Sequence, residues 1–374
     1  MRYKEYGKTG KQVSVLGFGA MRFDPPDDEE NAIKTVHKAV ELGINYFDSA
    51  PGYCKDNSET FLGKALSLLP PEKQKEIYVS TKTSIGSDPT ADDVRKRIED
   101  QLKKLRRDTI TFYNQWCIMD LDQFKRVMAP GGPFEGAQKA KEEGLIEHLA
   151  FSTHARGDEI AEMVKDSPFE GVTMGYNILN HRLRNEGMKA AHAAGLAVMT
   201  MNPLGGGMLC HSEEKLGFLR EDESDHFISA SLRFIFSHPE VTVVLSGMGV
   251  PEHVEFNVEV ANSVKGPNPE TVERIIEKYD KLGEKYCTGC RYCLEDCPEG
   301  IQIHILMRLA DCLRMGMDAE AKRLYEMFNK NAEMWLKNKY AKDCTECGSC
   351  EDLCTQQLPI QEYLANVAEF FGEK

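Results

Sequence analysis

Residues 13–50 read VSVLGFGAMRFDPPDDEENAIKTVHKAVELGINYFDSA, and this stretch decides the fold. It opens on an apolar, β-branched run (13–19), passes through an amphipathic segment (29–43) and closes on a second apolar run (46–50). Because strand-like and helix-like segments alternate, we expect a strand, a helix and a second strand that lies parallel to the first.

The same alternation continues along the chain. Strand-like runs lie at 13–19, 46–50, 77–82, 109–116, 146–153, 171–177, 196–203 and 241–247, with amphipathic segments such as 90–106 and 251–263 between them. Eight β/α units in about 250 residues are the size of a closed (β/α)8 TIM barrel. We therefore predict an α/β fold with such a barrel in residues 1–265. An open doubly wound sheet is the alternative, although no G-x-G-x-x-G follows the first strand.

Polar and small residues interrupt these runs at one end of the predicted barrel. They fall at the carboxyl ends of successive strands: Asp48, Lys82, Trp116, Ser152, Asn177, Pro203 and Gly247. Active sites of (β/α)8 barrels are built at that end. The ring of residues therefore predicts a mouth that binds a ligand.

Two cysteine arrays mark the C-terminal part of the chain, each with the spacing C-x2-C-x2-C-x3-C: Cys287, Cys290, Cys293 and Cys297, then Cys344, Cys347, Cys350 and Cys354. In two-cluster ferredoxins, three cysteines of such an array bind one iron–sulfur cluster and the fourth binds the other. We therefore expect two [4Fe–4S] clusters, the first held by Cys287, Cys290, Cys293 and Cys354, and the second by Cys344, Cys347, Cys350 and Cys297. Zinc is the alternative, because paired C-x2-C spacing also suits tetrahedral sites.

The segment between the arrays has a helical pattern. Its apolar residues recur at helical spacing, and we expect them in a core: Leu324, Met327, Phe328, Met334 and Trp335. A closing amphipathic helix is indicated by Tyr363, Leu364, Val367 and Phe370. We predict a second, smaller domain in residues 266–374 that is mainly α-helical and ferredoxin-like.

The formal net charge of −14 argues against partners that demand a basic surface. Nucleic acids and anionic membranes are such partners. The first residues, MRYKEYGKTG, do not resemble a signal peptide, and no apolar run is long enough to span a bilayer. We expect a cytoplasmic protein of a reducing, oxygen-poor cell. A redox partner with a basic patch would be steered toward an acidic surface, which also serves solubility alone. The oligomeric state is not predicted.

Several motifs resemble those of one family: LGFGAMRF (16–23), FDSAPGY (47–53), SETFLGKAL (58–66), STKTS (80–84), AFSTH (150–154), GYN (175–177), NPLGGGML (202–209) and LSGMGVPEHVEFN (245–257). With these motifs and the cysteine arrays, the chain resembles the aldo-keto reductase family, and specifically its branch with a C-terminal ferredoxin-type domain. The resemblance implies a nicotinamide-dependent oxidoreductase that acts on a small organic substrate.

By this resemblance, Asp48, Tyr53 and Lys82 match three of the four catalytic positions. A carbonyl that accepts a hydride becomes an alkoxide and needs a proton donor, for which a tyrosine with a pKa of about 10 is poor. We expect Lys82 to lower the pKa of Tyr53, while Asp48 holds Lys82 charged and oriented. From spacing alone, a tyrosine after a Pro-Gly turn beside a structural Asp–Lys pair is the alternative.

The fourth position departs from the family. Reductases of this kind usually carry a histidine at the end of the fourth strand, where this chain has Trp116. An indole can donate through its N–H but cannot titrate as an imidazole does. We therefore expect Trp116 to orient a substrate oxygen or to line the pocket by stacking.

The resemblance also implies a dinucleotide site at the mouth. Ser152 and Asn177 match residues that hold the nicotinamide carboxamide, and the other matching segments are the pyrophosphate loop (Pro203, Leu204, Gly205 and Gly207) and the adenosine end (Ser246, Gly247, Met248 and Asn257). Three positions differ from the family: Thr153 replaces an asparagine, Met201 a stacking tyrosine and His253 an arginine that clamps the 2′-phosphate. NADP is the expected cofactor and NAD the alternative.

Hydride chemistry and cluster chemistry do not couple directly, because nicotinamide transfers two electrons and a [4Fe–4S] cluster accepts one. A flavin would bridge them, but the sequence has no flavin signature. Three interpretations stay open. The clusters relay electrons to or from a partner, or they are structural, or the chain is a nucleotide-binding sensor or electron-transfer subunit with little turnover.

Overall fold

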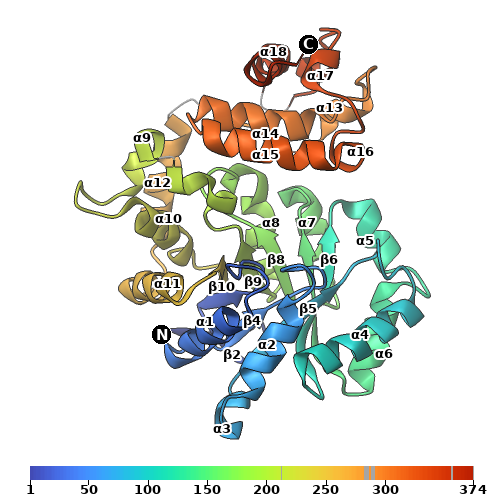
Figure 1. Ribbon diagram of the computed structural model, residues 1–374, viewed down its shortest axis with the longest axis vertical. Coiled ribbons are helices and arrows are strands. Elements are labelled where there is room, and N and C mark those ends of the chain that lie inside the picture. Colours follow the sequence, from blue (N-terminus) through green and yellow to red (C-terminus); the bar gives the residue numbers. More distant parts are fainter. Residues whose placement is uncertain (212, 282–285, 288–290, 355–356, 374) are drawn as a thin grey trace. The chain divides into compact units, whose positions relative to one another are not determined.

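The computed structural model comprises residues 1–374 and describes all of them except 212, 282–285, 288–290, 355–356 and 374 (Figure 1). The chain forms two compact units. The barrel unit consists of Met1–Pro203 and Ser229–Glu273, and the helical unit consists of Leu204–Ile228 and Arg274–Lys374. The segment Leu204–Ile228, which follows the seventh barrel strand, therefore belongs to the same unit as the C-terminal part of the chain.

The barrel unit contains a closed barrel of eight parallel strands, which confirms the predicted fold class. The strands are β3 (Leu16–Gly19), β4 (Tyr46–Asp48), β5 (Tyr78–Thr83), β6 (Ile110–Ile118), β7 (Ile146–Thr153), β8 (Gly171–Gly175), β9 (Ala197–Met201) and β10 (Val243–Gly247). They follow one another in chain order, and β10 closes the barrel by pairing with both β9 and β3. Each of the eight predicted runs overlaps one of these strands.

Helices surround the strands (Figure 1). They are α1 (Glu29–Glu41), α2 (Ser58–Ser67), α3 (Pro71–Gln74), α4 (Ala91–Leu105), α5 (Leu121–Val127), α6 (Pro133–Glu142), α7 (Gly157–Met163), α8 (His181–Ala193), α10 (Phe227–Phe236) and α11 (Pro251–Ser263). Local sequence fixes where they begin. Asp28 caps α1 by accepting from the backbone N–H of Asn31, and Thr90 and Asp93 form a capping box on α4. Such caps satisfy N–H groups that a first helical turn leaves open.

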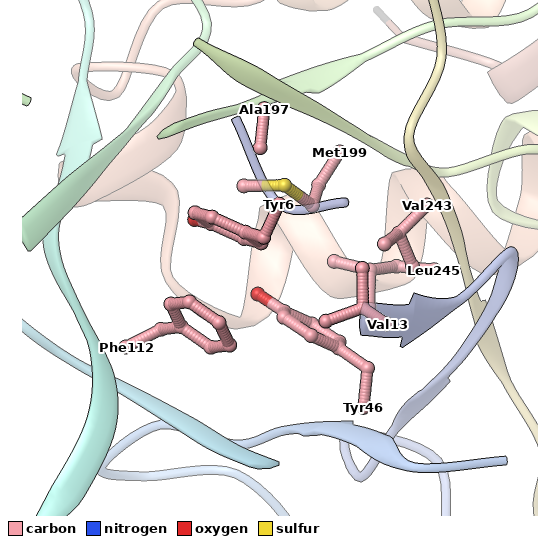
Figure 2. Close-up of a cluster of buried hydrophobic side chains, with 8 residues drawn as sticks. All are labelled: Tyr6, Val13, Tyr46, Phe112, Ala197, Met199, Val243 and Leu245. Carbon is pink, nitrogen blue, oxygen red and sulfur yellow. The ribbon is translucent and has the colours of Figure 1, made fainter. Parts of the chain in front are cut away.

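A hairpin that the sequence patterns did not predict precedes the barrel. Strands β1 (Tyr3–Glu5) and β2 (Gln12–Ser14) pair antiparallel, so the run 13–19 splits between β2 and β3. The hairpin turn places Tyr6 in a cluster of buried side chains (Figure 2): Val13, Tyr46, Phe112, Ala197, Met199, Val243 and Leu245. Three of these residues begin barrel strands. Tyr6 therefore fills the amino-terminal end of the barrel.

Close packing at this end also explains a glycine. A Cβ atom at Gly171, the first residue of β8, would lie 2.1 Å from the hydroxyl oxygen of Tyr6. The Tyr6 ring in turn stacks on Phe112, with ring centroids 3.9 Å apart. The amino-terminal end is therefore filled by side chains, while the carboxyl ends of the strands carry the polar residues.

The helical unit contains no β-strand among its described residues. Its elements are η1 (Gly205–His211), α9 (Glu213–Leu216), η2 (Gly217–Leu219), α13 (Tyr292–Glu295), α14 (Ile303–Arg314), α15 (Asp318–Lys330), α16 (Ala332–Trp335), η3 (Ala341–Asp343), α17 (Ser349–Asp352) and α18 (Ile360–Phe371). Helix α12 (Pro269–Lys281) carries the chain from the first unit into the second. No helix in the described part of the chain is both long and apolar enough to cross a bilayer.

The predicted core stripe of the helical unit is only partly correct. Leu324 and Phe328 are buried on α15, and Leu364 and Val367 are buried on α18. The expectation of burial is wrong for the other three members of the stripe, whose exposed fractions are 38% for Met327, 67% for Met334 and 38% for Trp335. Helical spacing identifies residues that share a face, but it does not show whether a neighbour covers that face.

Candidate functional site

A buried ion pair lies at the carboxyl end of two neighbouring barrel strands. Asp48 ends β4, Lys82 lies near the end of β5, and Lys82 Nζ is 2.5 Å from Asp48 Oδ2. Lys82 Nζ also donates to the carbonyl oxygen of Ser49 over 2.6 Å. Both charged side chains are almost fully buried. The strand order therefore brings together two of the predicted catalytic residues.

Neighbouring strands hold the carboxylate of Asp48 in place. Ser80 Oγ donates to Asp48 Oδ1 over 2.9 Å, and Asn114 Nδ2 donates to Ser80 Oγ over the same distance. Burial has the largest single influence on the pKa of Lys82 and would lower it, but the charge and hydrogen bond of Asp48, together with Tyr53 and Glu59, outweigh burial and raise that pKa. The ammonium group is therefore kept charged in a buried position.

Tyr53 follows β4 in a loop with an unusual backbone. Gly52 and the next residues Cys54, Lys55 and Asp56 all have positive φ, of 77°, 51°, 57° and 69°. Residues other than glycine adopt this region only at an energetic cost. The loop places the Tyr53 ring with its centroid 5.3 Å from Lys82 Nζ. The third predicted catalytic residue thus lies next to the ion pair.

The expected pKa of Tyr53 requires a correction. Burial raises the pKa of Tyr53 above its ordinary value, and the positive charge of Lys82 does not overcome this effect. Asp48 adds its negative charge in the same direction as burial. Lys82 does lower the pKa of Tyr53, as predicted, but its influence is smaller than that of burial, whose depth the sequence does not reveal, so the pKa is raised on balance. Tyr53 stays protonated at neutral pH and is able to donate a proton.

Trp116 lies against Tyr53 at an irregular point of β6. The two rings meet edge to face, with centroids 5.7 Å apart and an interplanar angle of 89°. The pairing of β6 with β7 shifts register between Gln115 and Ile118, and Cys117 has a φ of 61°. Such a bulge re-aims side chains at a strand end. The residue at the fourth family position therefore contacts the predicted proton donor.

The predicted carboxamide site lies on β7 and just after β8. Ser152 Oγ accepts from the backbone N–H of Cys117 over 3.0 Å, which leaves its hydroxyl hydrogen free to donate. The side chain of Asn177 donates to the carbonyl of Asn202 over 3.0 Å and accepts from the N–H of Leu179 over 2.9 Å. An amide retains one further donor and one further acceptor site after these two bonds.

The side chain of Thr153 is less suited than those of Ser152 and Asn177 to binding the nicotinamide carboxamide. Its side chain is fully buried, donates to the carbonyl of Ile118 over 2.8 Å and accepts from the N–H of Ala155 over 2.9 Å. The first bond joins β7 to β6, and the second holds the turn that follows β7. The side chain of Thr153 therefore braces the strand end, and its assignment to the cofactor stays a prediction.

The segment after β9 has a backbone that depends on glycine. Met201 ends β9 half-buried, and Pro203 is buried two residues later. Gly205 and Gly207 have φ values of 61° and 104°, which other residues rarely adopt. Leu204, Gly205 and Gly207 begin the helical unit. Their assignment to the pyrophosphate stays a prediction.

The segment after β10 is tied together by side chains. Asn257 Nδ2 donates to Ser246 Oγ over 3.0 Å, and the N–H of Gly249 donates to His253 Nδ1 over 3.3 Å. Met248 is fully buried, and its assignment to the cofactor stays a prediction. Helix α11 begins at Pro251 without a side-chain cap. Pro251 has no N–H and the N–H of His253 donates to the carbonyl of Val250 over 3.1 Å, so in the first turn Glu252 keeps an N–H that suits an anion such as a phosphate.

One mouth residue was missed by the sequence analysis. Arg22 lies in the loop after β3, and its stem packs on Gly247 at the end of β10. It belongs to the motif LGFGAMRF and follows a strand end by three residues. The strand-end criterion that selected the other residues, extended to the first loop, would have found it.

Comparison with known proteins agrees with this geometry. Residues 15–279 match the aldo/keto reductase family. The chain belongs to the aldo/keto reductase family. It is 27% identical to the L-galactose dehydrogenase of Arabidopsis thaliana over 308 residues, which are 74% of this chain and 94% of the relative. It is 30% identical to the 6-dehydroglucose reductase of Novosphingobium aromaticivorans, over 55% of this chain and 70% of that one.

A solved aldo-keto reductase from Bacillus halodurans, in its holo form, has a TM-score of 0.64 and 25% identity to the chain. The match covers 75% of this chain and 96% of the other. Family membership identifies the chain as an oxidoreductase of the aldo/keto reductase type. The family match ends before the first cysteine array, so the arrays are features beyond the aldo/keto reductase barrel.

Four array cysteines lie around one recess of the helical unit. Cys297, Cys344, Cys347 and Cys350 line it together with Pro298, Glu299, Ile301, Ile303, Thr345, Gly348, Gln361 and Leu364. These are the four cysteines that the spacing assigns to the second cluster. Within the described residues, no three His, Cys, Asp or Glu side chains converge as ligands of a single metal ion would. The recess is therefore a shared space between four thiols.

The first array is described only in part, because Cys290 lies outside the described residues. The backbone N–H of Cys287 donates to Asp311 Oδ2 over 2.9 Å, and Arg314 reaches Asp311 Oδ1 over 3.1 Å. Burial raises the pKa of Asp311 to about 7 despite these two partners. The Arg314 guanidinium lies over two aromatic rings, 4.9 Å from the centroid of Tyr286 and 4.5 Å from that of Tyr363. This cluster anchors the start of the first array on α14 and α18.

Proposed function

We propose that the chain is a nicotinamide-dependent oxidoreductase that interconverts a small carbonyl compound and its alcohol at the barrel mouth. The observation that carries this proposal is the buried Lys82–Asp48 pair beside Tyr53. When bound, the nicotinamide supplies or accepts the hydride. The residues described above provide what the cofactor lacks, which is a positioned proton donor.

Each catalytic side chain has a separate task. Tyr53 remains protonated because burial raises its pKa, so it donates a proton to the substrate oxygen as negative charge develops there. The Lys82 ammonium beside it stabilises the phenolate that Tyr53 becomes after the transfer. Asp48 keeps that ammonium charged and fixed, and Ser80 and Asn114 keep Asp48 from rotating.

The residues present fit a dinucleotide. Ser152 has a free donor, Asn177 has a free donor and acceptor site, and Glu252 has an N–H in the first turn of α11. Trp116 packs edge to face against Tyr53 and offers an N–H to a substrate oxygen. NADP is the cofactor that family membership favours. His253 in place of a phosphate-binding arginine keeps NAD as the alternative.

We further propose two [4Fe–4S] clusters in the helical unit, which relay electrons to or from a protein partner. The recess lined by Cys297, Cys344, Cys347 and Cys350 supports the second cluster, because thiolates are the ligands such clusters require. Pro298, Ile301, Ile303 and Leu364 give the recess apolar walls. The described cysteines form no disulfide, which is consistent with a reducing compartment such as the cytoplasm.

One experiment tests both parts of the proposal. The full-length protein is purified without oxygen, its iron and sulfide are measured, and it is titrated with NADPH and with NADH while its visible spectrum is recorded. We expect iron with an equal amount of sulfide, and NAD(P)H oxidation when a carbonyl panel is added. Iron-free protein with intact thiols would exclude the clusters. Tight NAD(P)H binding without turnover of any carbonyl would exclude the reductase.

A second function is favoured by one observation, the indole of Trp116 where reductases have an imidazole. In that case the chain is a nucleotide-binding sensor or electron-transfer subunit with little turnover. Trp116→His distinguishes the two. A sensor gains carbonyl turnover when the imidazole is supplied. An enzyme whose pocket is built around Trp116 loses turnover of its own substrate.

A further inference from the structure

Arg22 lies on a short loop that is fixed on both sides. On one side, the N–H of Ala20 donates to the carbonyl of Asp48 over 2.8 Å, and Ser58 Oγ donates to the carbonyl of Ala20 over 2.6 Å. These bonds attach the start of the loop to the strand and helix that flank Tyr53. The catalytic residues and Arg22 therefore share one rigid support.

On the other side, the loop is attached to the segment after β10. The N–H of Asp24 donates to the carbonyl of Gly249 over 3.3 Å. Asn31 Nδ2 bridges the same two residues, because it donates to the carbonyl of Asp24 over 2.7 Å and to that of Gly249 over 2.9 Å. Arg22 is thus held between β4 and β10.

The side chain of Arg22 extends across the strand end. A Cβ atom at Gly247 would lie 2.6 Å from Arg22 Cγ and 3.1 Å from Arg22 Cβ, so the aliphatic stem lies directly on that glycine. The residue is exposed. Burial has the largest influence on the pKa of Tyr53 and raises it, whereas the charge of Arg22 opposes that rise. The charge of Arg22 therefore acts on Tyr53 in the same direction as that of Lys82, and more weakly.

The charge of Arg22 is not balanced by the protein around it. Lys82, the other cation near Tyr53, is paired with Asp48. Within the described residues, no carboxylate forms an ion pair with Arg22, although the chain carries 60 acidic residues against 46 basic ones. An unpaired guanidinium offers a planar fork that fits a carboxylate with two parallel hydrogen bonds.

We propose that Arg22 binds a carboxylate of the substrate, so that the enzyme acts on carbonyl or alcohol compounds that carry a carboxylate. This inference rests on the proposed function and names its substrate class. A phosphate of the cofactor has the same anionic chemistry. The substrate is favoured because the loop that carries Arg22 is hydrogen-bonded to Asp48 and to Ser58, on either side of Tyr53 in the chain, and Tyr53 is the proposed proton donor to the substrate.

A matched pair of ligands tests the proposal. Phenylglyoxylate and its methyl ester differ only in whether the carboxylate is free. Their affinities for the full-length protein saturated with NADPH are measured by calorimetry, together with kcat/KM for each. The measurements are repeated on Arg22→Gln and on Arg106→Gln. Arg106 is an exposed arginine at the C-terminal end of α4, so its substitution makes the same change of charge away from the strand ends.

In Arg22→Gln we expect the affinity for phenylglyoxylate to fall about 10- to 100-fold, the loss of a charge-assisted hydrogen bond, while the ester changes less than about twofold. Arg106→Gln should leave both affinities unchanged. Equal affinities of wild type and Arg22→Gln for the acid would overturn the proposal. So would a loss of NADPH affinity in Arg22→Gln with an unchanged ratio of acid to ester, because the cation would then serve the cofactor.

The binding measurement separates this inference from the proposed function. If neither ligand is reduced, the proposed reductase activity fails, but the acid–ester difference in affinity still decides the role of Arg22. If Tyr53→Phe abolishes reduction of both ligands and keeps the acid–ester difference in affinity, both the proposed function and the role of Arg22 are supported.

Discussion

The barrel unit and the helical unit hold two carboxylates in opposite ways: Glu170 of the barrel is half-buried and Asp311 of the helical unit is buried. In the barrel, Glu170 accepts from His148, Lys141 and the N–H of Leu149, and these donors outweigh burial and lower the pKa of Glu170 to about 2. In the helical unit, burial outweighs two partners and raises the pKa of Asp311 to about 7. The barrel unit stabilises the charged form of Glu170 with hydrogen-bond donors. The helical unit instead leaves the carboxyl group of Asp311 buried beside a cysteine array, where its charged form is disfavoured.

The same contrast holds at the two candidate sites. The Asp48–Lys82 pair is complete within the protein, because Ser49, Ser80 and Asn114 supply the remaining hydrogen bonds. The four cysteines of the recess surround a space and do not converge on one point. The barrel unit completes the hydrogen bonds of its charged pair with its own side chains and backbone. We propose that the helical unit instead depends on inorganic groups.

The largest effect is expected at Tyr53. Tyr53→Phe removes the proton donor and keeps the ring against Trp116, so turnover should fall by about 10²- to 10⁴-fold, as for the loss of a general acid. NADPH affinity should not change. Steady-state kinetics and fluorescence titration measure the two quantities. Tyr78→Phe, at the amino-terminal end of β5, is the matched control. A Tyr53→Phe enzyme with full activity would show that another group donates the proton.

The second effect tests whether the two units are independent. Cys347→Ser removes an exposed ligand of the recess and should cost about half of the iron, since one of two clusters is lost. The helical unit should become sensitive to proteolysis while the barrel unit resists and still binds NADPH. Cys210→Ser, at a half-buried cysteine outside the arrays, is the control. Unchanged iron in Cys347→Ser would remove the recess as a cluster site.

Sequence patterns could predict most of the barrel because its signals are local. Each β/α unit repeats a strand pattern and a helix pattern, and Asp48 and Lys82 lie at strand ends that parallel order brings side by side. Recognition of the recess was also possible from spacing, since Cys297 lies with Cys344, Cys347 and Cys350.

The misses concern features that depend on distant residues. Tyr6 is buried at the amino-terminal end of the barrel only because residues of strands far along the chain surround it. The pKa of Tyr53 depends on burial by the folded mouth. The exposure of Trp335 depends on which neighbours pack against α16. A local sequence pattern predicts none of these three features, because each depends on residues that only the fold brings together.

A smaller effect is expected at Asp311. Asp311→Leu leaves the N–H of Cys287 without its acceptor and Arg314 without its carboxylate, which should destabilise the helical unit by about 2 kcal/mol. Asp311→Asn keeps an oxygen for the N–H of Cys287 and should lose less. Urea unfolding followed by iron release compares the two variants. Equal stability of Asp311→Leu and wild type would mean that the anchor does not stabilise the first array.

The smallest effect concerns Glu170 at the amino-terminal end of the barrel. Its pKa of about 2 in the folded protein lies below the ordinary value of 4.5, so the folded state binds the proton more weakly than the unfolded state. The stabilisation is therefore fully present above pH 4.5 and is lost as the pH falls toward 2.

Glu170→Gln should lower the free energy of unfolding by about 1 kcal/mol at pH 7. Urea unfolding at pH 7, 4 and 3 should show this difference shrinking with acid. Glu72→Gln, at an exposed position of α3, should show no difference at any pH. A penalty for Glu170→Gln that stays constant to pH 3 would mean that packing at Glu170, and not its charge, ties β7 to β8.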